Sequence, residues 1–178
     1  LQASSYKAIA LVLVFILVYV AWAFRKVSDP VSSWKYGAVA IITLLHDVSI
    51  PVGVFAYLGH FFGDEIDMQF ISGILTILGF SVHDTIVGFD RIREKLLREK
   101  ARGLFEDIVE RSVKETIVRS INTSLTAIAA LTAVFFFGGE TTRFMSLLLI
   151  IGMAVGVYSS IFIASPLLVS FERIKKRA

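Results

Sequence analysis

Five apolar runs dominate this sequence, and each approaches or exceeds the roughly 20 residues that a helix needs to cross a hydrocarbon core of about 30 Å. These runs are Tyr6–Phe24, Tyr36–Gly59, Met68–Phe89, Ser120–Gly138 and Phe144–Phe171. Lipid offers the backbone no partners, so each run must satisfy its own hydrogen bonds as a helix, and the period-2 alternation of membrane strands is nearly absent. The chain is 56% hydrophobic, with a mean hydropathy of +0.75. It is predicted to be an all-α membrane protein, a single transmembrane domain built as a bundle of five transmembrane helices.

The basic residues are divided unequally between the two sides that these helices define. Of the 18 Lys and Arg residues, all but Lys7 and Arg143 fall on one side. On the other side, the loop 59–68 contains acidic residues and no Lys or Arg. Because positive charge accumulates in cytoplasmic loops, we expect the N-terminus of this chain to lie outside and its C-terminus to be cytoplasmic.

The longest polar stretch, 90–119, lies on the predicted cytoplasmic side. Its apolar residues recur mostly at three- and four-residue steps with charges between them, which predicts an amphipathic helical hairpin broken near Gly103. Such a pair could rest at the level of the lipid headgroups, or it could present a docking surface to a cytosolic partner. We favour the first interpretation.

Asp84 is an ionisable residue inside the third apolar run. It lies about 9 Å from the inner boundary at Asp90, at 1.5 Å per helical residue. Arg119 immediately precedes the fourth run on the same side, so the two side chains are close enough in depth to pair if their helices are neighbours. Burial raises the pKa of a carboxylate and a nearby guanidinium lowers it, so movement of the Arg would change proton affinity. The sequence therefore indicates a proton relay at Asp84 and Arg119, and the alternative is a static bridge between two helices.

Asp47 is a second acid at membrane depth, about 16 Å from the same face. It stands four residues before Pro51, which removes a backbone donor and can kink a helix. Asp47 could therefore hold that kink by a hydrogen bond across helices, or it could share the proton path. The sequence leaves both roles open.

Other kinds of site are not indicated. His46 and His83 are interpreted as polar packing residues, because no spacing here matches a helical metal motif. The chain has no cysteine, and no phosphate-binding glycine loop, nucleophile elbow or HExxH motif occurs. We expect no metal, no cofactor and no enzymatic activity. The basic charge is explained by membrane orientation, so no nucleic acid is expected as a partner.

Small residues mark a helix contact in the last run. Gly152, Gly156 and Ser160 follow one another at four-residue steps and so share one helix face. Small side chains on one face allow close backbone approach between membrane helices. This face is therefore predicted to pack against another helix.

Five blocks of residues, in the same order and spacing, resemble the SecF family of protein-export membrane proteins. They are Leu44–Val48, Gly79–Glu94, Arg119–Thr126, Gly138–Glu140 and Tyr158–Pro166. The resemblance implies half of an RND-superfamily transporter, with six transmembrane helices and an external domain between the first and second. Since this chain shows five runs and begins at Leu1, we expect it to start just before the second family helix.

The resemblance also implies a function and partners. The resemblance implies that the chain pairs with SecD and uses the proton gradient to draw a translocating protein from the SecYEG channel. Membrane lipid is a further expected partner. Asp84 looks like the family's membrane-embedded acid and Arg119 like its basic partner. The relay neighbours are expected to be Ser81, His83, Thr85 and Thr123. The family often has Asn where this chain has His83, and an imidazole there can itself titrate.

Two other functions fit the same residues. A proton-coupled efflux or lipid-transporter half of the RND superfamily would use the same relay. A structural membrane scaffold would instead bind partners through 90–119 and would need no relay acid. The acid at Asp84 distinguishes the first two functions from the third, and we expect the export function.

Overall fold

The computed structural model describes residues 11, 14–16, 18–20, 22–23, 32–62, 68–98 and 104–177. Its elements in chain order are α2 (Ser33–Phe62), α3 (Met68–Arg98), α4 (Phe105–Phe137), α5 (Glu140–Ser159), the π-helical turn η1 (Ser160–Ala164) and α6 (Ser165–Arg177). The described residues contain no strand. The predicted all-α architecture is confirmed.

Four helical stretches are long and apolar enough to cross a membrane: Trp34–His60, Gln69–Arg98, Phe105–Phe137 and Thr142–Arg173. The chain is thus a multi-pass membrane protein. The first predicted run, 6–24, lies mostly outside the described residues, although those described within it are helical. The number of five membrane helices therefore stays a prediction.

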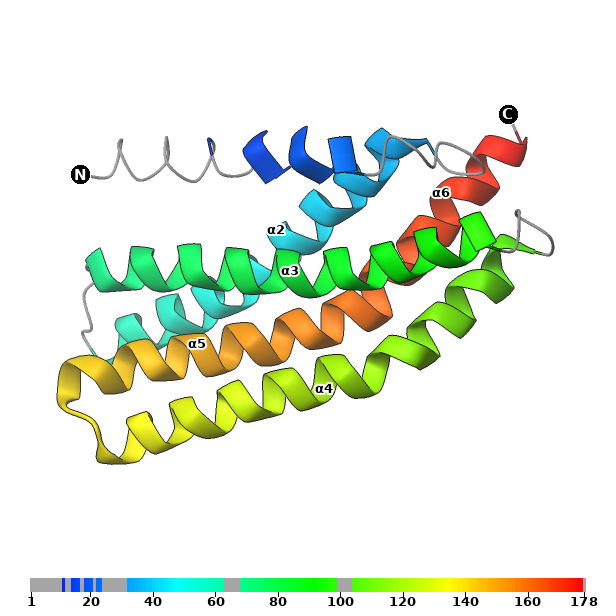
Figure 1. Cartoon of the computed structure of the whole chain (residues 1–178). Coiled ribbons are helices and arrows are strands. Elements are labelled where there is room, and N and C mark those ends of the chain that lie inside the picture. Colours follow the sequence, from blue (N-terminus) through cyan, green and yellow to red (C-terminus); the bar gives the residue numbers. More distant parts are fainter. Residues whose placement is uncertain are drawn as a thin grey trace.

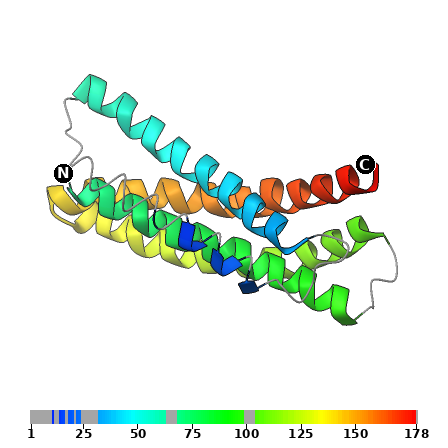
Figure 2. The same cartoon turned by 90° about the horizontal axis from the view of Figure 1, so that it is seen from above.

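Helices α3 and α5 form the centre of the bundle, because they contact each other and each also contacts α2 and α4. Figure 1 shows α3, α5 and α4 side by side along their lengths. Helix α2 crosses this layer, and seen from above it diverges from the other helices towards its Phe62 end (Figure 2). The start of α2, the end of α3, the start of α4 and the end of α6 meet at one end of the bundle (Figure 1).

The predicted cytoplasmic hairpin 90–119 consists of extensions of two membrane helices. Helix α3 runs without a break from its apolar part to Arg98, and α4 runs from Phe105 into its apolar part. Neither Gly nor Pro interrupts 89–98 or 105–137, and lengthening an existing helix is easier than nucleating a new one. At 31 residues, α3 spans about 46 Å, which exceeds a hydrocarbon core of about 30 Å.

The last apolar run, predicted as one helix, is divided by the π-helical turn η1. The cause lies just beyond the turn, at Pro166. A proline inside a helix lacks the N–H that would bond the carbonyl of Phe162, and its ring crowds that carbonyl. A widened turn relieves this conflict, and such turns occur frequently at functional sites.

Two apolar cores lie towards opposite ends of the bundle. One joins α2, α3, α4 and α6, and within it the rings of Tyr36 and Phe89 meet edge to face at 5.4 Å. The other joins α2, α3 and α5, and there Phe55 packs edge to face on Phe144 at 4.6 Å. On α3 the first core begins at Phe89 and the second ends at Leu78. Between them, the buried residues of α3 are Ser81 and Thr85, and with Asp84 they form a polar layer.

Helices α3 and α5 pack closely through glycines. A Cβ atom added at Gly152 would lie 2.3 Å from Cδ1 of Ile77, and one added at Gly73 would lie 2.5 Å from Cδ2 of Leu148. A Cβ added at Gly156 would lie 3.3 Å from that of Ser81. The face predicted to contact another helix thus faces α3 within the same bundle.

We expect Gly152→Ala to destabilise the protein, because the new methyl group would overlap the Ile77 side chain, and overpacking costs about 1–3 kcal/mol. Gly79→Ala is the matched control on α3, since a Cβ there meets no atom within 4 Å. That change should leave the melting temperature equal or higher, because Ala favours helix over Gly by about 1 kcal/mol. Equal melting temperatures for the two variants would contradict the predicted close contact.

Candidate functional site

Asp84 lies where α3, α4 and the turn η1 meet. The Ser120 hydroxyl of α4 donates a hydrogen bond of 2.6 Å to its Oδ1 atom. The Ser160 hydroxyl, at the first position of η1, donates to the other carboxyl oxygen, Oδ2. Both oxygens of this partly buried acid therefore accept a hydrogen bond, each from a different element.

The sequence places these serines by helical spacing and by the proline-induced turn. On α4, small hydroxyl residues recur every four positions at Ser112, Thr116, Ser120 and Ser124, and the three serines are buried. Residues four apart share one helix face, so this face of α4 brings Ser120 to α3. Ser160 is the residue at which α5 widens into the π-helical turn.

A second acid, Asp47, lies on α2 and is fully buried at 0% exposure. The Ser81 hydroxyl of α3 donates to its Oδ2 atom, and His46 Nδ1 lies 3.1 Å from Oδ1. Ser81 precedes Asp84 by three residues, so Asp47 is bonded to α3 about one turn before Asp84. On the facing α5, Gly156 packs against Ser81 and Ser160 follows it by one turn.

Arg119 lies near Asp84 without pairing with it. Both residues line one small cavity of about 60 Å³. Among the ion pairs between described residues, none joins them, and Arg119 is exposed. The reason is angular: Arg119 and Ser120 are neighbours in sequence and leave α4 in different directions, and it is Ser120 that faces Asp84. The depth of a residue along its helix, which was one basis for the predicted pairing, does not determine the direction of its side chain.

The other predicted relay residues divide between the two acids. Ser81 binds Asp47, while His83 and Thr123, both exposed, line the small cavity with Asp84. Thr85 is buried, and its Oγ1 atom has no hydrogen-bond partner in the described part of the chain. The structure therefore places one predicted neighbour at Asp47 and two beside Asp84.

The roles of Ser120 and Ser160 at Asp84 were not anticipated. Ser160 is predicted to serve helix packing, and Ser120 enters the sequence-based predictions only as the start of the fourth apolar run and as part of the block Arg119–Thr126 that resembles the SecF family. The four-residue serine spacing on α4 was a usable signal for Ser120. The Ser165–Pro166 pair was a signal for the widened turn, but not for the carboxyl oxygen that Ser160 would reach.

A larger cavity of about 760 Å³ opens at the charged end of the bundle, between the described residues Tyr19 and Ala23, α3 and α4. It shares Val87 and Arg119 with the small cavity at Asp84. Its other lining residues are Ile86, Asp90, Arg91, Arg93, Glu94, Glu115 and Thr116. The two cavities adjoin, so Val87 and Arg119 stand between Asp84 and the charged end.

Ion pairs join the helices at this charged end. Glu115 of α4 accepts hydrogen bonds from Arg91 at 2.7 Å and from Lys95 at 2.6 Å, both on α3. Glu106 of α4 is held by two hydrogen bonds of 2.6 Å from Arg173 of α6. Helix α4 is thus bonded to both α3 and α6 beyond the apolar segments.

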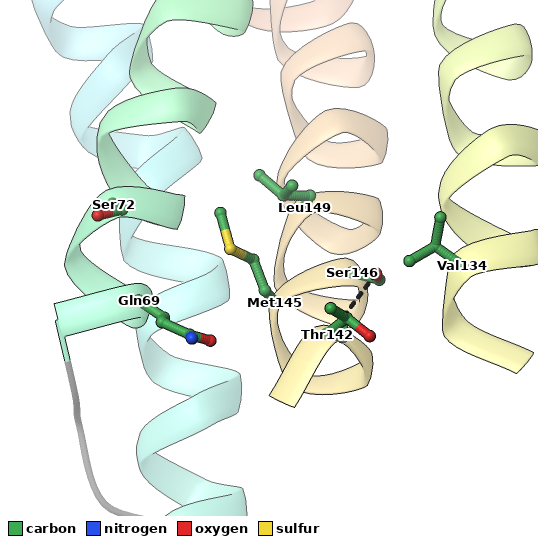
Figure 3. Close-up of a pocket in the computed structure, with 7 residues that line it drawn as sticks. All are labelled: Gln69, Ser72, Val134, Thr142, Met145, Ser146 and Leu149. Carbon is green, nitrogen blue, oxygen red and sulfur yellow. Dashed lines mark hydrogen bonds between the residues drawn. The ribbon is translucent and has the colours of Figure 1, made fainter. Parts of the chain in front are cut away.

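A further cavity of about 510 Å³ lies at the opposite end of the bundle, between α3, α4 and α5 (Figure 3). Its lining residues include no acid or base; they are Gln69, Ser72, Val134, Thr142, Met145, Ser146 and Leu149. The Ser146 hydroxyl donates to the Thr142 carbonyl at 2.6 Å, and the Thr142 hydroxyl donates to the Gly139 carbonyl at 2.8 Å. Both hydroxyls are thus used locally, and neither Asp84 nor Asp47 lines this cavity.

Residues 1–174 match the family model of the protein export membrane protein SecD/SecF, C-terminal. Protein translocase subunit SecF of Thermobaculum terrenum is 56% identical over 168 residues, which are 94% of this chain and 52% of that protein. The SecF subunit of Sebaldella termitidis is 41% identical, over 99% of this chain and 53% of its own length. The chain thus spans about half the length of these curated relatives.

The fold is also found in solved structures. The crystal structure of SecDF, a translocon-associated membrane protein from Thermus thermophilus, superposes with a TM-score of 0.84 at 34% identity, covering 97% of this chain and 22% of that one. A SecDF structure in a super-membrane-facing form gives a TM-score of 0.79 at 37% identity, covering 93% of this chain and 21% of that one. With the match to the family model over 1–174, these similarities show that the chain belongs to the SecD/SecF protein-export membrane protein family.

Proposed function

We propose that this chain forms the membrane part of an accessory subunit of the Sec protein-export machinery. It acts with SecD and couples proton movement through the membrane to late steps of protein translocation. The observation on which this depends is Asp84, a carboxyl group at membrane depth held by hydroxyls from two other elements. The names of the relatives, protein translocase subunits SecF and SecDF, support the export role.

The surroundings of Asp84 suit a proton site better than a static contact. Ionisable groups inside a membrane are costly, and they usually mark ion or proton routes. The cavity of about 60 Å³ beside Asp84 has room for water, and through Val87 and Arg119 it adjoins the larger cavity at the charged end. Water in these cavities would give protons a path to Asp84 from that side.

Arg119 supplies the charge that changes the proton affinity of Asp84. It lines the same small cavity and makes no ion pair with Asp84 in this structure. A rotation of α4 that brought the guanidinium to the carboxyl would favour the ionised form and release the proton. Arg remains protonated throughout, so it serves as a fixed charge.

Asp47 is the second acid of the proposed relay. It is fully buried, and it is bonded to Ser81, three residues before Asp84 on α3. Its neighbour His46 has a side chain that is 34% exposed, so the His46–Asp47 pair extends from the polar layer to the surface of this chain. Proton exchange between the two acids would pass along this layer.

The exposed surface of α4 supports the proposal that this chain contacts a membrane partner such as SecD. Only 11% of its most apolar window is buried within the chain, compared with 39% to 44% for the other three membrane-length helices. Polar residues on this exposed helix include Arg119, Asn122 and Thr123. Facing lipid they would be costly, whereas another protein could satisfy them. SecYEG, the translocating protein and membrane lipid complete the proposed set of partners.

The proposed orientation places the N-terminus outside and the C-terminus in the cytoplasm. Because the chain contains no cysteine, an Asp64→Cys variant carries a single reactive thiol in this chain, at a position between α2 and α3. We expect a membrane-impermeant maleimide to label it in intact cells, and a cysteine placed at Gly103 only after permeabilisation. Labelling in the reverse order would contradict the orientation.

The proposed function is tested by measuring export. The full-length protein containing this chain, with its SecD partner, is placed in inverted vesicles, and completion of secretory-protein translocation is followed in sodium-free buffer. A proton gradient should accelerate completion several-fold only when the protein is present. Equal rates with and without the gradient would favour the scaffold, and gradient-driven extrusion of small molecules without an effect on export would favour an efflux transporter.

A further inference from the structure

The Ser160 hydroxyl has two acceptors within reach, although it has only one proton to donate. It bonds Asp84 Oδ2, and it lies 3.1 Å from the backbone carbonyl oxygen of Val157. Ser120, the other hydroxyl at Asp84, has no second acceptor among the described residues. The two serines that bind Asp84 are therefore not equivalent.

This difference decides what happens when Asp84 takes up a proton. An ionised carboxylate only accepts hydrogen bonds, whereas a protonated carboxyl group donates one through its O–H. One serine must then change from donor to acceptor. Ser160 can do so without loss, because its own proton can turn to the Val157 carbonyl. Ser120 would lose its only acceptor.

Ser160 also stands where the helix changes from α-helical to π-helical geometry. It is the first residue of η1, and the Ser165 hydroxyl donates to its carbonyl oxygen at 3.3 Å. Beyond the turn, Arg173 of α6 is bonded to Glu106 of α4. A change in the bonding of Ser160 thus acts on a joint between α5 and α6 rather than on a continuous helix.

We propose that Ser160 is a positioning residue. Its hydrogen bonds change with the protonation state of Asp84, and this change acts on the joint between α5 and α6. Ser160 donates to the ionised carboxylate, and on protonation it accepts from the carboxyl group and donates to Val157. The π-helical turn allows Ser160 to exchange its hydrogen-bond partners, and α6 moves when this exchange occurs. This inference rests on the proposed function, since it takes Asp84 as the proton site.

The titratable groups around this site come from each helix packed there. Helix α3 contributes His83, and α4 contributes Arg119, both of which line the cavity with Asp84. Helix α2 contributes Asp47 and His46, bonded to Ser81 on α3. The charged residues of α5, Glu140 and Arg143, lie at its opposite end. Unlike these groups, Ser160 is neutral, so it acts on Asp84 through hydrogen bonding alone.

The test compares Ser160→Ala, which removes the hydroxyl, with Ser160→Thr, which keeps it. Ser159→Ala is the control, because Ser159 is the adjacent serine, is fully buried where Ser160 is partly buried, and donates to the Gly156 carbonyl at 3.0 Å rather than to Asp84. The full-length protein in proteoliposomes is titrated by infrared difference spectroscopy. The carboxyl band absent from Asp84→Asn reports the protonation of Asp84.

We expect Ser160→Ala to move the midpoint of this titration to higher pH by about one unit, because a hydrogen bond to a charged group favours the charged form. Ser160→Thr should return the midpoint to the wild-type value, and Ser159→Ala should not move it. A midpoint unchanged in Ser160→Ala, or shifted equally in Ser159→Ala, would overturn the inference.

The spectroscopic readout separates this inference from the proposed function. A midpoint that depends on the Ser160 hydroxyl, found together with gradient-dependent export in Asp84→Asn, would support the hydroxyl exchange and reject proton coupling through Asp84. If the midpoint does not depend on the Ser160 hydroxyl and export still requires Asp84, the hydroxyl exchange is rejected and the proposed function is retained.

Discussion

Replacing Asp84 with Asn is expected to abolish the response of export to a proton gradient while leaving a folded protein in the membrane. Asn has nearly the same size, and its Oδ1 atom can still accept the bond from Ser120. Its amide can donate to Ser160, which then turns to the Val157 carbonyl. The site therefore keeps its hydrogen bonds and loses only the ability to ionise, so we expect the free energy of unfolding to change by less than about 1 kcal/mol.

The measurement is translocation in inverted vesicles, with and without the gradient, together with the melting temperature of each purified variant. Asp107→Asn is the matched control, since Asp107 lies on α4, is exposed, and lines neither of the two cavities that adjoin at Asp84. The control should retain the several-fold acceleration, and Asp84→Asn should lose it. A well-folded Asp84→Asn protein with wild-type acceleration would reject the relay. A destabilised variant that still responds to the gradient would show that Asp84 serves as a structural bridge.

The membrane helices could be predicted because their signal is local. Apolar runs of about 20 residues have few alternatives in lipid, and α2 to α5 lie where four of those runs predicted helices. The continuation of α3 and α4 beyond the membrane was also present in the sequence, as the absence of Gly and Pro from 89–98 and 105–137. The change from apolar to charged residues after Phe89 indicates where the chain leaves the lipid, and it does not tell whether the helix continues.

The partners of Asp84 could not be predicted because they depend on how helices are rotated relative to one another. Counting residues from the membrane boundary gave the depth of Asp84 and Arg119, but a difference of one residue on α4 separates Arg119 from Ser120, which faces the acid. The turn at Ser160 depends on Pro166, six residues later. A proline inside a helix can instead be accommodated without such a turn, as Pro51 is within α2.

The second large effect is expected at Asp47, where stability and function can be separated. Asp47→Ala should destabilise the protein by about 2–4 kcal/mol, because it leaves the buried Ser81 hydroxyl without its acceptor and opens a cavity. Asp47→Asn keeps an acceptor for Ser81 and nearly the same volume, so it should cost less than half as much. Thermal or denaturant unfolding of the purified variants measures both.

A double-mutant cycle with Ser81→Ala tests whether the loss comes from this bond. Ser81→Ala in the wild-type background removes the donor, whereas in the Asp47→Ala background it removes a group that is already unpaired. The two effects should therefore differ by about 1 kcal/mol or more. Additive effects would show that Asp47 is held by His46 or by packing rather than by Ser81.

Export by Asp47→Asn then decides the role that the sequence left open. If Asp47 passes protons to Asp84, this variant should fold, keep its bond to Ser81 and still lose most of the acceleration by the gradient. If Asp47 only joins α2 to α3, the same variant should export like the wild type, because the bond survives. Only a relay needs the carboxyl group to ionise, so a well-folded Asp47→Asn protein with full gradient-dependent export would leave Asp84 as the single acid of the relay.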